Sequence, residues 1–290
     1  MLNRLLLDAS QVPLLRQVVQ EGNVTVLERQ DFYALTVGGL LELVCAQTRW
    51  LEEKNSVGLS FFERCAARFA LLQATHRQLI DARGSGAQFR WLPEDGAIVI
   101  RVVSHRAAFD DELEYSEFQQ AFVRRLKSCG FNAGFATALS SLMAEIVENV
   151  PDHSAPEGVE MSPALIGYHT QPGVVDLSVM DLGRGVLASL RENPKWAWLS
   201  NSREAIMATL EKGATRLTFH ATGGGFRQAI KSVVDRNGLM RVASGDGAAI
   251  VIAVRQGRQV TGELAPWLPG MRVTLSFSLL GEPKEIPIPA

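Results

Sequence analysis

Glu145 and Asn149 are residue types that could activate a nucleophile and bind a metal ion. They lie four residues apart in a stretch with helical spacing of apolar residues, so their side chains are one turn apart on the same side. Magnesium prefers hard oxygen ligands such as a carboxamide oxygen, and a nearby carboxylate can deprotonate a hydroxyl that attacks a phosphate. Glu145 is therefore a candidate catalytic base and Asn149 a candidate Mg2+ ligand. Two exposed polar residues near a helix end are the simpler alternative.

Asp181 could recognise a nucleobase. It follows the apolar run 174–180 and precedes Gly183 and Gly185. A carboxylate at the end of a buried strand must accept hydrogen bonds or be protonated, and the exocyclic amine of adenine is a suitable donor. The spaced glycines allow a ligand to approach the backbone closely. A turn aspartate that accepts local backbone hydrogen bonds is the alternative.

A glycine cluster could bind phosphate groups. Thr222, Gly223, Gly224 and Gly225 directly precede a helical pattern over 226–235. Backbone N–H groups at a helix N-terminus favour anions, because they coincide with the positive end of the helix dipole. An ordinary flexible loop is the alternative. Together, the three segments predict a site for magnesium and a nucleoside triphosphate.

The spacing of apolar residues predicts the elements that position these segments. Helical spacing occurs over 36–51, 61–80, 116–127, 135–149, 201–212 and 226–235. Extended runs occur over 24–27, 89–92, 97–103, 174–180, 239–243, 248–255 and 271–279, with a hairpin expected between 89–92 and 97–103. Pro151 is expected to end or kink the helix that carries Asn149. Antiparallel strands with helices gathered on one face predict an α+β layered fold.

The chain is long enough for two domains. Its 290 residues suggest a boundary near His105, just before the acidic run Asp110-Asp111-Glu112. We expect a smaller N-terminal α/β domain over residues 1–105, with a regulatory or partner-recognition role. We expect the three candidate segments to lie in a second domain over residues 106–290.

Composition excludes several classes of protein. The net charge of −2 gives no overall field that would attract nucleic acid or anionic lipid, so neither is an expected partner. Cys45, Cys65 and Cys129 lie far apart in apolar stretches and are expected to be buried thiols rather than a disulfide framework or zinc site. No run reaches the roughly 18 uncharged apolar residues that span a bilayer. We therefore expect a cytoplasmic protein.

These motifs resemble those of the GHKL family of ATPases and kinases. The order E-x-x-x-N-x-x-x-H, then D-x-G-x-G, then a glycine cluster that opens a helix is similar to its histidine-kinase and anti-sigma-factor branch, over residues 115–280. The resemblance implies the Bergerat ATP-binding fold, a two-layer α/β sandwich, with ATP and Mg2+ as cofactors. It assigns residues to three boxes as follows: Glu145 and Asn149 to the N-box, Asp181, Gly183 and Gly185 to the G1 box, and Gly223, Gly224 and Gly225, preceded by Thr222, to the G2 box.

By this resemblance Asn149 binds Mg2+, Asp181 recognises adenine and Glu145 is the catalytic base. Two positions depart from the family pattern. Pro151 interrupts the N-box, which leaves the placement of His153 open. Met271 stands where many relatives carry a threonine that supports adenine binding, and Thr274 in the same strand is the nearest candidate for the cofactor site.

Two functions follow from the resemblance. The first is an ATPase, or a protein kinase of the serine/threonine type, in which Glu145 activates a hydroxyl in a regulatory protein partner. The second is a non-catalytic switch, in which ATP orders the segment 186–222 and so controls a partner. That segment contains Trp196 and Trp198, of which we expect one in the core and the other in a lid or interface. The sequence is also compatible with a homodimer.

Overall fold

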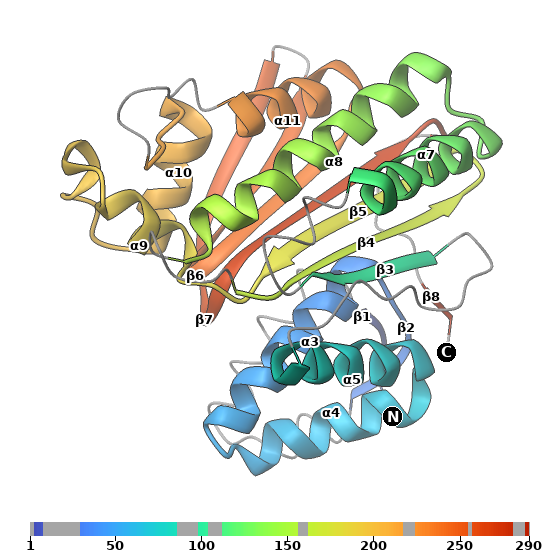
Figure 1. The fold of residues 1–290 in the computed structure, drawn as a ribbon, viewed down its shortest axis with the longest axis vertical. Helices are drawn as coiled ribbons and strands as arrows, with labels where there is room; N and C mark the ends of the chain where they lie inside the picture. Colours follow the sequence, from blue (N-terminus) through green and yellow to red (C-terminus); the bar gives the residue numbers. More distant parts are fainter. Residues whose placement is uncertain are drawn as a thin grey trace.

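The protein has an α+β fold built around an antiparallel sheet (Figure 1). The structure, a computed structural model, describes residues 3–7, 30–85, 98–103, 112–155, 162–216, 224–254, 257–280 and 288–289. The large sheet has five strands in the order β3-β4-β5-β7-β6, and every neighbouring pair is antiparallel. A small sheet has the order β1-β2-β8, in which β1 and β2 are parallel.

The strands differ widely in length. The strands of the large sheet are β3 (Ile98–Val103), β4 (Ala164–Gln171), β5 (Val174–Asp181), β6 (Leu239–Val254) and β7 (Gly257–Ser278). Those of the small sheet are β1 (Asn3–Leu7), β2 (Gln30–Leu35) and β8 (Ile288–Pro289). The pairing of β6 with β7 shifts register on either side of Gly245, so this long pair is irregular in the middle.

Helices cover both faces of the large sheet (Figure 1). The helices before the predicted boundary are α3 (Val37–Glu52), α4 (Ser56–Arg68) and α5 (Ala70–Ser85). Those after it are α7 (Glu112–Ser128), α8 (Ala133–His153), α9 (Gly185–Arg191), the short 3-10 helix η1 (Pro194–Trp196), α10 (Ser202–Lys212) and α11 (Gly224–Asp235). Figure 1 shows α7, α8 and α11 on one face of the sheet and α3 against the other.

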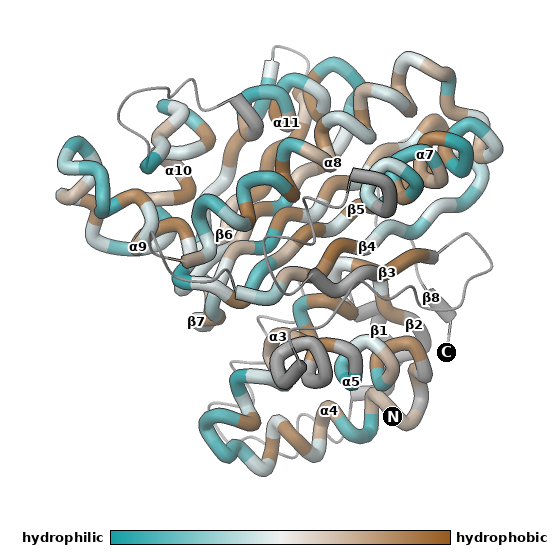
Figure 2. The backbone as a smooth tube through the Cα atoms, in the orientation of Figure 1, coloured by the Kyte–Doolittle hydropathy of each residue, from teal (hydrophilic) through white to brown (hydrophobic). Residues whose placement is uncertain are grey.

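Strand alternation produces the two faces. In β5, Val175, Leu177 and Val179 belong to the core cluster that includes α7, α8 and α11, whereas Met180 belongs to the cluster that includes α3. Successive side chains of a strand point to opposite faces, so each face has its own core. Figure 2 shows hydrophobic stretches along β4 and β5 and a largely hydrophilic α7. Hydrophobic burial on both faces therefore holds the sheet between two layers of helices.

Most of the predicted helices are confirmed, and one is divided. The periodic segments at 36–51, 116–127, 135–149, 201–212 and 226–235 correspond to α3, α7, α8, α10 and α11. The prediction of one helix over 61–80 is wrong, because Phe69 adopts an extended conformation that separates α4 from α5. Phe69 is itself buried, so its tertiary packing outweighs the continuous helical pattern.

The strand predictions have a mixed outcome. The strand over 174–180 is confirmed as β5, while the runs at 239–243 and 248–255 are parts of one strand, β6. The sequence patterns did not indicate β4, which lies between the edge strand β3 and the central strand β5. Two expected strands lie outside the described residues: the run at 24–27, and the run at 89–92 that was expected to form a hairpin with 97–103. In the structure β3 pairs with β4.

Of the two alternatives expected at Pro151, an end of the helix is wrong. The helix α8 does not end at the proline but continues to His153, with Ser154 as its C-cap. Two arginines satisfy carbonyls of its last turn: Arg216 donates to the Asp152 oxygen at 2.6 Å and Arg184 to the His153 oxygen at 3.2 Å. These bonds stabilise the C-terminal end of α8, because the last carbonyls of a helix have no partner within the helix.

Elements on both sides of the predicted domain boundary share the large sheet. The strand β3 pairs with β4, and α3 packs against β4, β5 and β7. The boundary position, His105, lies outside the described residues. No helix among the described residues combines the length and the apolar character needed to cross a bilayer.

Candidate functional site

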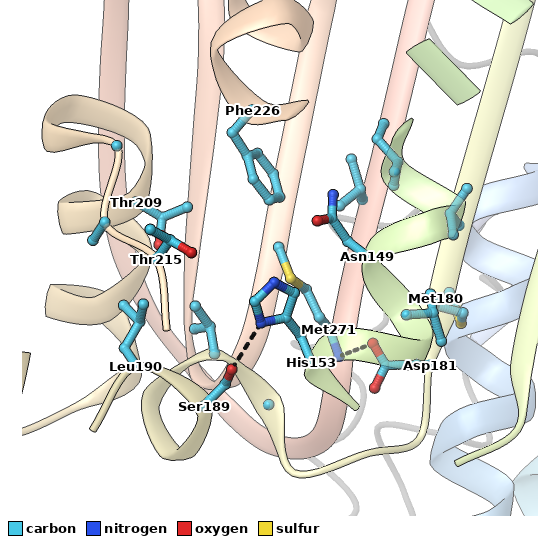
Figure 3. A pocket seen from close by; sticks show the side chains of 18 residues that line it. Asn149, His153, Met180, Asp181, Ser189, Leu190, Thr209, Thr215, Phe226 and Met271 are labelled. Atoms are coloured by element: carbon cyan, nitrogen blue, oxygen red, sulfur yellow. Dashed lines mark hydrogen bonds between the residues drawn. The ribbon is translucent and has the colours of Figure 1, made fainter. Parts of the chain in front are cut away.

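A cavity of about 110 Å3 lies where α8, α9, α10 and the first turn of α11 meet β5 and β7 (Figure 3). Its walls are largely apolar. They include Ile146 and Val150 of α8, Val179 and Val273 of the sheet, and Val186 and Leu190 of α9. Such a mainly apolar cavity with a few polar groups is typical of a small-molecule site.

Asp181 is the carboxylate that lines this cavity. It is the last residue of β5 and only 7% exposed. Its Oδ1 accepts from the Gly183 N–H at 2.7 Å, and its Oδ2 accepts from the Met271 N–H at 3.2 Å. Burial raises its pKa from 3.8 to about 6, although the two backbone donors and the charge of Arg272 act in the opposite direction. The side chain is therefore mainly ionised at neutral pH.

Three glycines allow the backbone to fit around Asp181. A Cβ at Gly183 would lie 2.1 Å from the Ser154 oxygen, and one at Gly270 would lie 1.8 Å from the Asp181 oxygen. Gly185 and Gly270 also have positive φ angles of 78° and 73°, which disfavour other residues. Steric crowding therefore explains why glycines occupy positions 183 and 185 after Asp181. Gly185 lines the cavity, whereas Gly183 holds the carboxylate through its N–H.

Asn149 faces the same cavity from α8 (Figure 3). Its side-chain nitrogen donates to the backbone oxygen of Glu145 at 2.7 Å. This bond orients the carboxamide and leaves its oxygen as the group that can accept from, or coordinate, a ligand. The described residues contain no group of three or more His, Cys, Asp or Glu that could hold a metal ion. A metal ion here would depend on Asn149, water and the ligand's own oxygens.

Glu145 does not line the cavity. Although it is one turn from Asn149, its side chain lies in a polar groove between α7 and α8 that also includes Gln119, Arg124 and Glu148. Burial raises the pKa of Glu145, and the like charge of Glu148 adds to this effect. The structure therefore separates the candidate base from the residues that form the cavity.

His153, whose placement the sequence left open, projects into the cavity (Figure 3). Its Nδ1 lies 3.0 Å from the Ser189 Oγ. Burial lowers its pKa, and the positive charge of Arg216 lowers it further. The imidazole is therefore neutral at physiological pH, and it adds a polar edge to the apolar cavity.

The remaining candidates lie in three different places. Gly224 and Gly225 begin α11, and Phe226, the next residue, lines the cavity. Thr222 and Gly223 lie outside the described residues. Thr274 lies on the opposite face of the sheet, where its Oγ1 is 3.0 Å from the Ser178 Oγ. The side-chain alternation of β7 explains this, because Met271 and Val273 line the cavity.

Several cavity residues had no signal in the sequence. Ser189, Thr209 and Thr215 lie on the wall opposite Asn149, and tertiary packing alone brings them there (Figure 3). For the two tryptophans, the structure decides which is buried: Trp196 is 7% exposed and Trp198 is 61% exposed. Phe226 differs from these residues, because the glycines that precede it in the sequence predicted a binding segment next to it.

Comparison with models of known protein families gives no match, and comparison with curated proteins gives no significant match. What the structure itself establishes is the class: an α+β protein with an apolar cavity that contains one buried carboxylate.

Proposed function

We propose that this protein binds ATP and Mg2+ in the cavity and belongs to the GHKL family, with residues 106–290 forming a Bergerat-type domain. The observation that carries the proposal is Asp181, a buried carboxylate in a mainly apolar cavity, held by the N–H groups of Gly183 and Met271. Fixed in this way, Asp181 can accept one further hydrogen bond from a ligand. An apolar planar ring with an amine at its edge has the complementary chemistry.

Adenine matches these features. Its faces would contact aliphatic side chains such as Ile146 and Val186, and its exocyclic amine would donate to Asp181. A hydrogen bond to a charged acceptor contributes about 1.5 to 3 kcal/mol. Because the pKa of Asp181 is about 6, this acceptor is charged at neutral pH and becomes protonated in moderate acid.

The chain also offers suitable groups for Mg2+ and phosphate. Asn149 presents one neutral oxygen, and Mg2+ is commonly bound by one or two protein ligands together with phosphate oxygens and water. Gly224 and Gly225 form the N-terminus of α11 next to Phe226, which lines the cavity. Their position favours phosphates at that end of the cavity. When bound, ATP would supply a terminal phosphate for transfer or hydrolysis.

Bound ATP could serve one of two functions. In the first, Glu145 acts as general base for water or for a hydroxyl of a regulatory protein partner, which makes the protein an ATPase or a protein kinase. In the second, ATP binding controls a partner without turnover. The position of Glu145 in the α7–α8 groove rather than the cavity favours the second use, unless an acceptor in that groove lies between Glu145 and the phosphate.

Calorimetric titration with ATP and ADP, with and without Mg2+, tests the binding. Asp181→Asn should weaken ATP binding about 10- to 100-fold through loss of the charged acceptor. Asn149→Ala should remove most of the Mg2+ dependence. Thr274→Val is the matched control, because Thr274 lies on the opposite face of the sheet and its replacement should leave the affinity unchanged. Absence of binding to the native protein at high micromolar nucleotide would refute the proposal.

Terminally labelled ATP distinguishes the two uses. Released phosphate indicates an ATPase, label on a protein indicates a kinase, and neither product supports the non-catalytic switch. Glu145→Gln should abolish turnover and spare binding if Glu145 is the base, whereas Glu148→Gln, in the same groove, should have a much smaller effect. Equal turnover in native protein and Glu145→Gln would exclude Glu145 as the base.

A further inference from the structure

Arg272 connects the helix α3 to a bulge of β7 at residues 268–271, whose last residue, Met271, lines the cavity. The residue lies in β7 on the α3 side of the sheet and is 3% exposed. Its Nη1 donates to the Pro269 oxygen at 3.0 Å and, at a longer 3.4 Å, to the Leu268 oxygen. Its Nε lies 3.8 Å from the Glu42 carboxylate of α3, which is equally buried.

The bulge held by Arg272 also holds Asp181. Within it, the Gly270 N–H donates to the Gly183 oxygen at 2.6 Å, and the Met271 N–H donates to the Asp181 Oδ2 at 3.2 Å. The Gly270 oxygen accepts from the Ser244 Oγ at 2.7 Å. A displacement of this bulge would therefore move one of the two donors that orient the Asp181 carboxylate.

A second contact joins α3 to the other strand of the site. The Cys45 Sγ lies 3.1 Å from the Met180 Sδ, and Met180 both precedes Asp181 and lines the cavity. Cys45 itself is fully buried. The helix thus touches β5 and β7 directly behind the residues that recognise the proposed ligand.

The charged groups around Arg272 indicate a positioning role rather than a stabilising one. The charges of Glu42 and Asp181 favour the guanidinium, and that of Arg241 opposes it. A buried ion pair adds little net stability, because desolvation of both groups offsets their attraction. What it supplies here is direction, because a planar guanidinium that faces Glu42 also reaches two carbonyls of the 268–271 bulge.

We propose that Arg272 is a positioning residue that couples the seating of α3 to nucleotide binding, so that the N-terminal part of the chain regulates the site. With α3 seated, Glu42 holds Arg272 against the carbonyls of the bulge, and the Met271 N–H stays hydrogen-bonded to Asp181. With α3 displaced, the guanidinium loses its carboxylate partner and the bulge loses its support. The inference rests on the proposed nucleotide function, because the coupled ligand is ATP.

Thermodynamic linkage makes the coupling measurable from both sides. If seated α3 tightens ATP binding by some factor, ATP must stabilise the seated helix by the same factor. Cys45 reports the seating, because its thiol is buried between α3 and the sheet. Cys129 is an internal control in the same chain, since it is buried in the core cluster on the opposite face of the sheet.

The experiment measures N-ethylmaleimide labelling of the cysteines in the full chain by peptide mass spectrometry, with and without ATP and Mg2+. ATP should slow labelling of Cys45 about fivefold or more relative to Cys129, as expected for allosteric coupling. Glu42→Gln and Arg272→Met should weaken ATP binding several-fold and abolish this extra protection. Glu263→Gln should change neither, because Glu263 pairs with the other buried arginine, Arg241, at 3.1 Å.

Equal protection of Cys45 and Cys129 by ATP in the native chain would overturn the coupling, and this measurement requires no substitution at Glu42 or Arg272. Unchanged ATP affinity and undiminished Cys45 protection in folded Glu42→Gln would overturn it as well. Failure of the native chain to bind ATP would instead refute the proposed function, and the inference with it. The two failures are therefore distinguishable.

Discussion

The two faces of the large sheet use the same strands in opposite ways. Toward α8 and α11, β5 and β7 present apolar side chains, among them Leu177, Val273 and Phe277. Toward α3 the alternate positions include buried polar side chains, among them Ser178, Thr274 and Ser276. One face is a conventional hydrophobic core that opens into the cavity at one end. The other combines an apolar helix contact with buried polar groups.

This difference teaches how the sheet combines stability with a fixed geometry. Burial of apolar area is favourable in almost any orientation, so the apolar clusters on both faces stabilise the fold without selecting one arrangement. Buried polar groups contribute little net stability, but they are favourable in few arrangements because each needs a partner. The polar groups of the second face therefore help to determine how α3 lies behind Asp181.

The largest expected effect lies on the apolar face. Phe277→Ala should destabilise the protein by about 4 kcal/mol, as expected for truncation of a buried aromatic side chain. Phe277 is 2% exposed, and its ring packs edge to face against the ring of Phe135 with the ring centroids 5.3 Å apart. Urea unfolding measures the loss, and Phe277→Leu should recover part of it. A loss below about 1 kcal/mol would contradict the assignment of this face as the main core.

The second largest effect should be a pH dependence of the free energy of unfolding, caused by Asp181 at the end of the apolar face. The folded pKa of Asp181, about 6, is above its ordinary value of 3.8, so between these values the folded state binds the proton more tightly than the unfolded state. Stability from this group is therefore greatest in acid and falls by up to about 3 kcal/mol as pH rises through this window.

The measurement compares the free energy of unfolding of native protein and Asp181→Asn from about pH 4 to about pH 7. The difference between them isolates Asp181 from His153, whose lowered pKa makes its own contribution fall as pH decreases. Parallel curves for the two proteins would show that Asp181 is not the titrating group.

On the polar face, the pair between α3 and β7 should matter less. Glu42→Gln should cost about 2 kcal/mol, because it removes the charged partner of the buried Arg272 but leaves a polar group of the same size beside it. Glu263→Gln is the matched substitution at the other buried arginine, and its effect should be about 0.5 kcal/mol since the Glu263 side chain is 52% exposed. If urea unfolding gave equal losses of stability for the two variants, the contact with α3 would not make the Glu42–Arg272 pair different from an exposed pair.

The smallest expected effect is at Ser276, the neighbour of Phe277 on the opposite face. Its Oγ is buried without a hydrogen-bond partner among the described residues. Ser276→Ala removes a desolvated hydroxyl and should change the free energy of unfolding by no more than about 0.5 kcal/mol. A loss above 1.5 kcal/mol in the same urea experiment would mean that the hydroxyl has a partner, such as an ordered water.

Local sequence patterns predicted the helix and strand that carry the site more reliably than they predicted which residues line the cavity. The helix with Asn149 and the strand that ends at Asp181 follow from apolar spacing, and both residues line the cavity. Glu145 shares the spacing of Asn149 but lies in another groove, because the neighbouring helix α7 decides what each side of α8 faces. Thr274 was placed near the site by proximity in sequence, although strand alternation turns it to the other face.

The sequence by itself determined most of the helices that pack on the large sheet, the strand that ends at Asp181 and the conformational need for Gly185. These depend on spacing and backbone sterics within a few residues. Tertiary structure alone decided that His153 enters the cavity, that Met271 donates to Asp181, and that α3 covers the back of the site. Each of these joins segments far apart in the chain, and contacts of that kind depend on packing of the whole sheet, which no local pattern encodes.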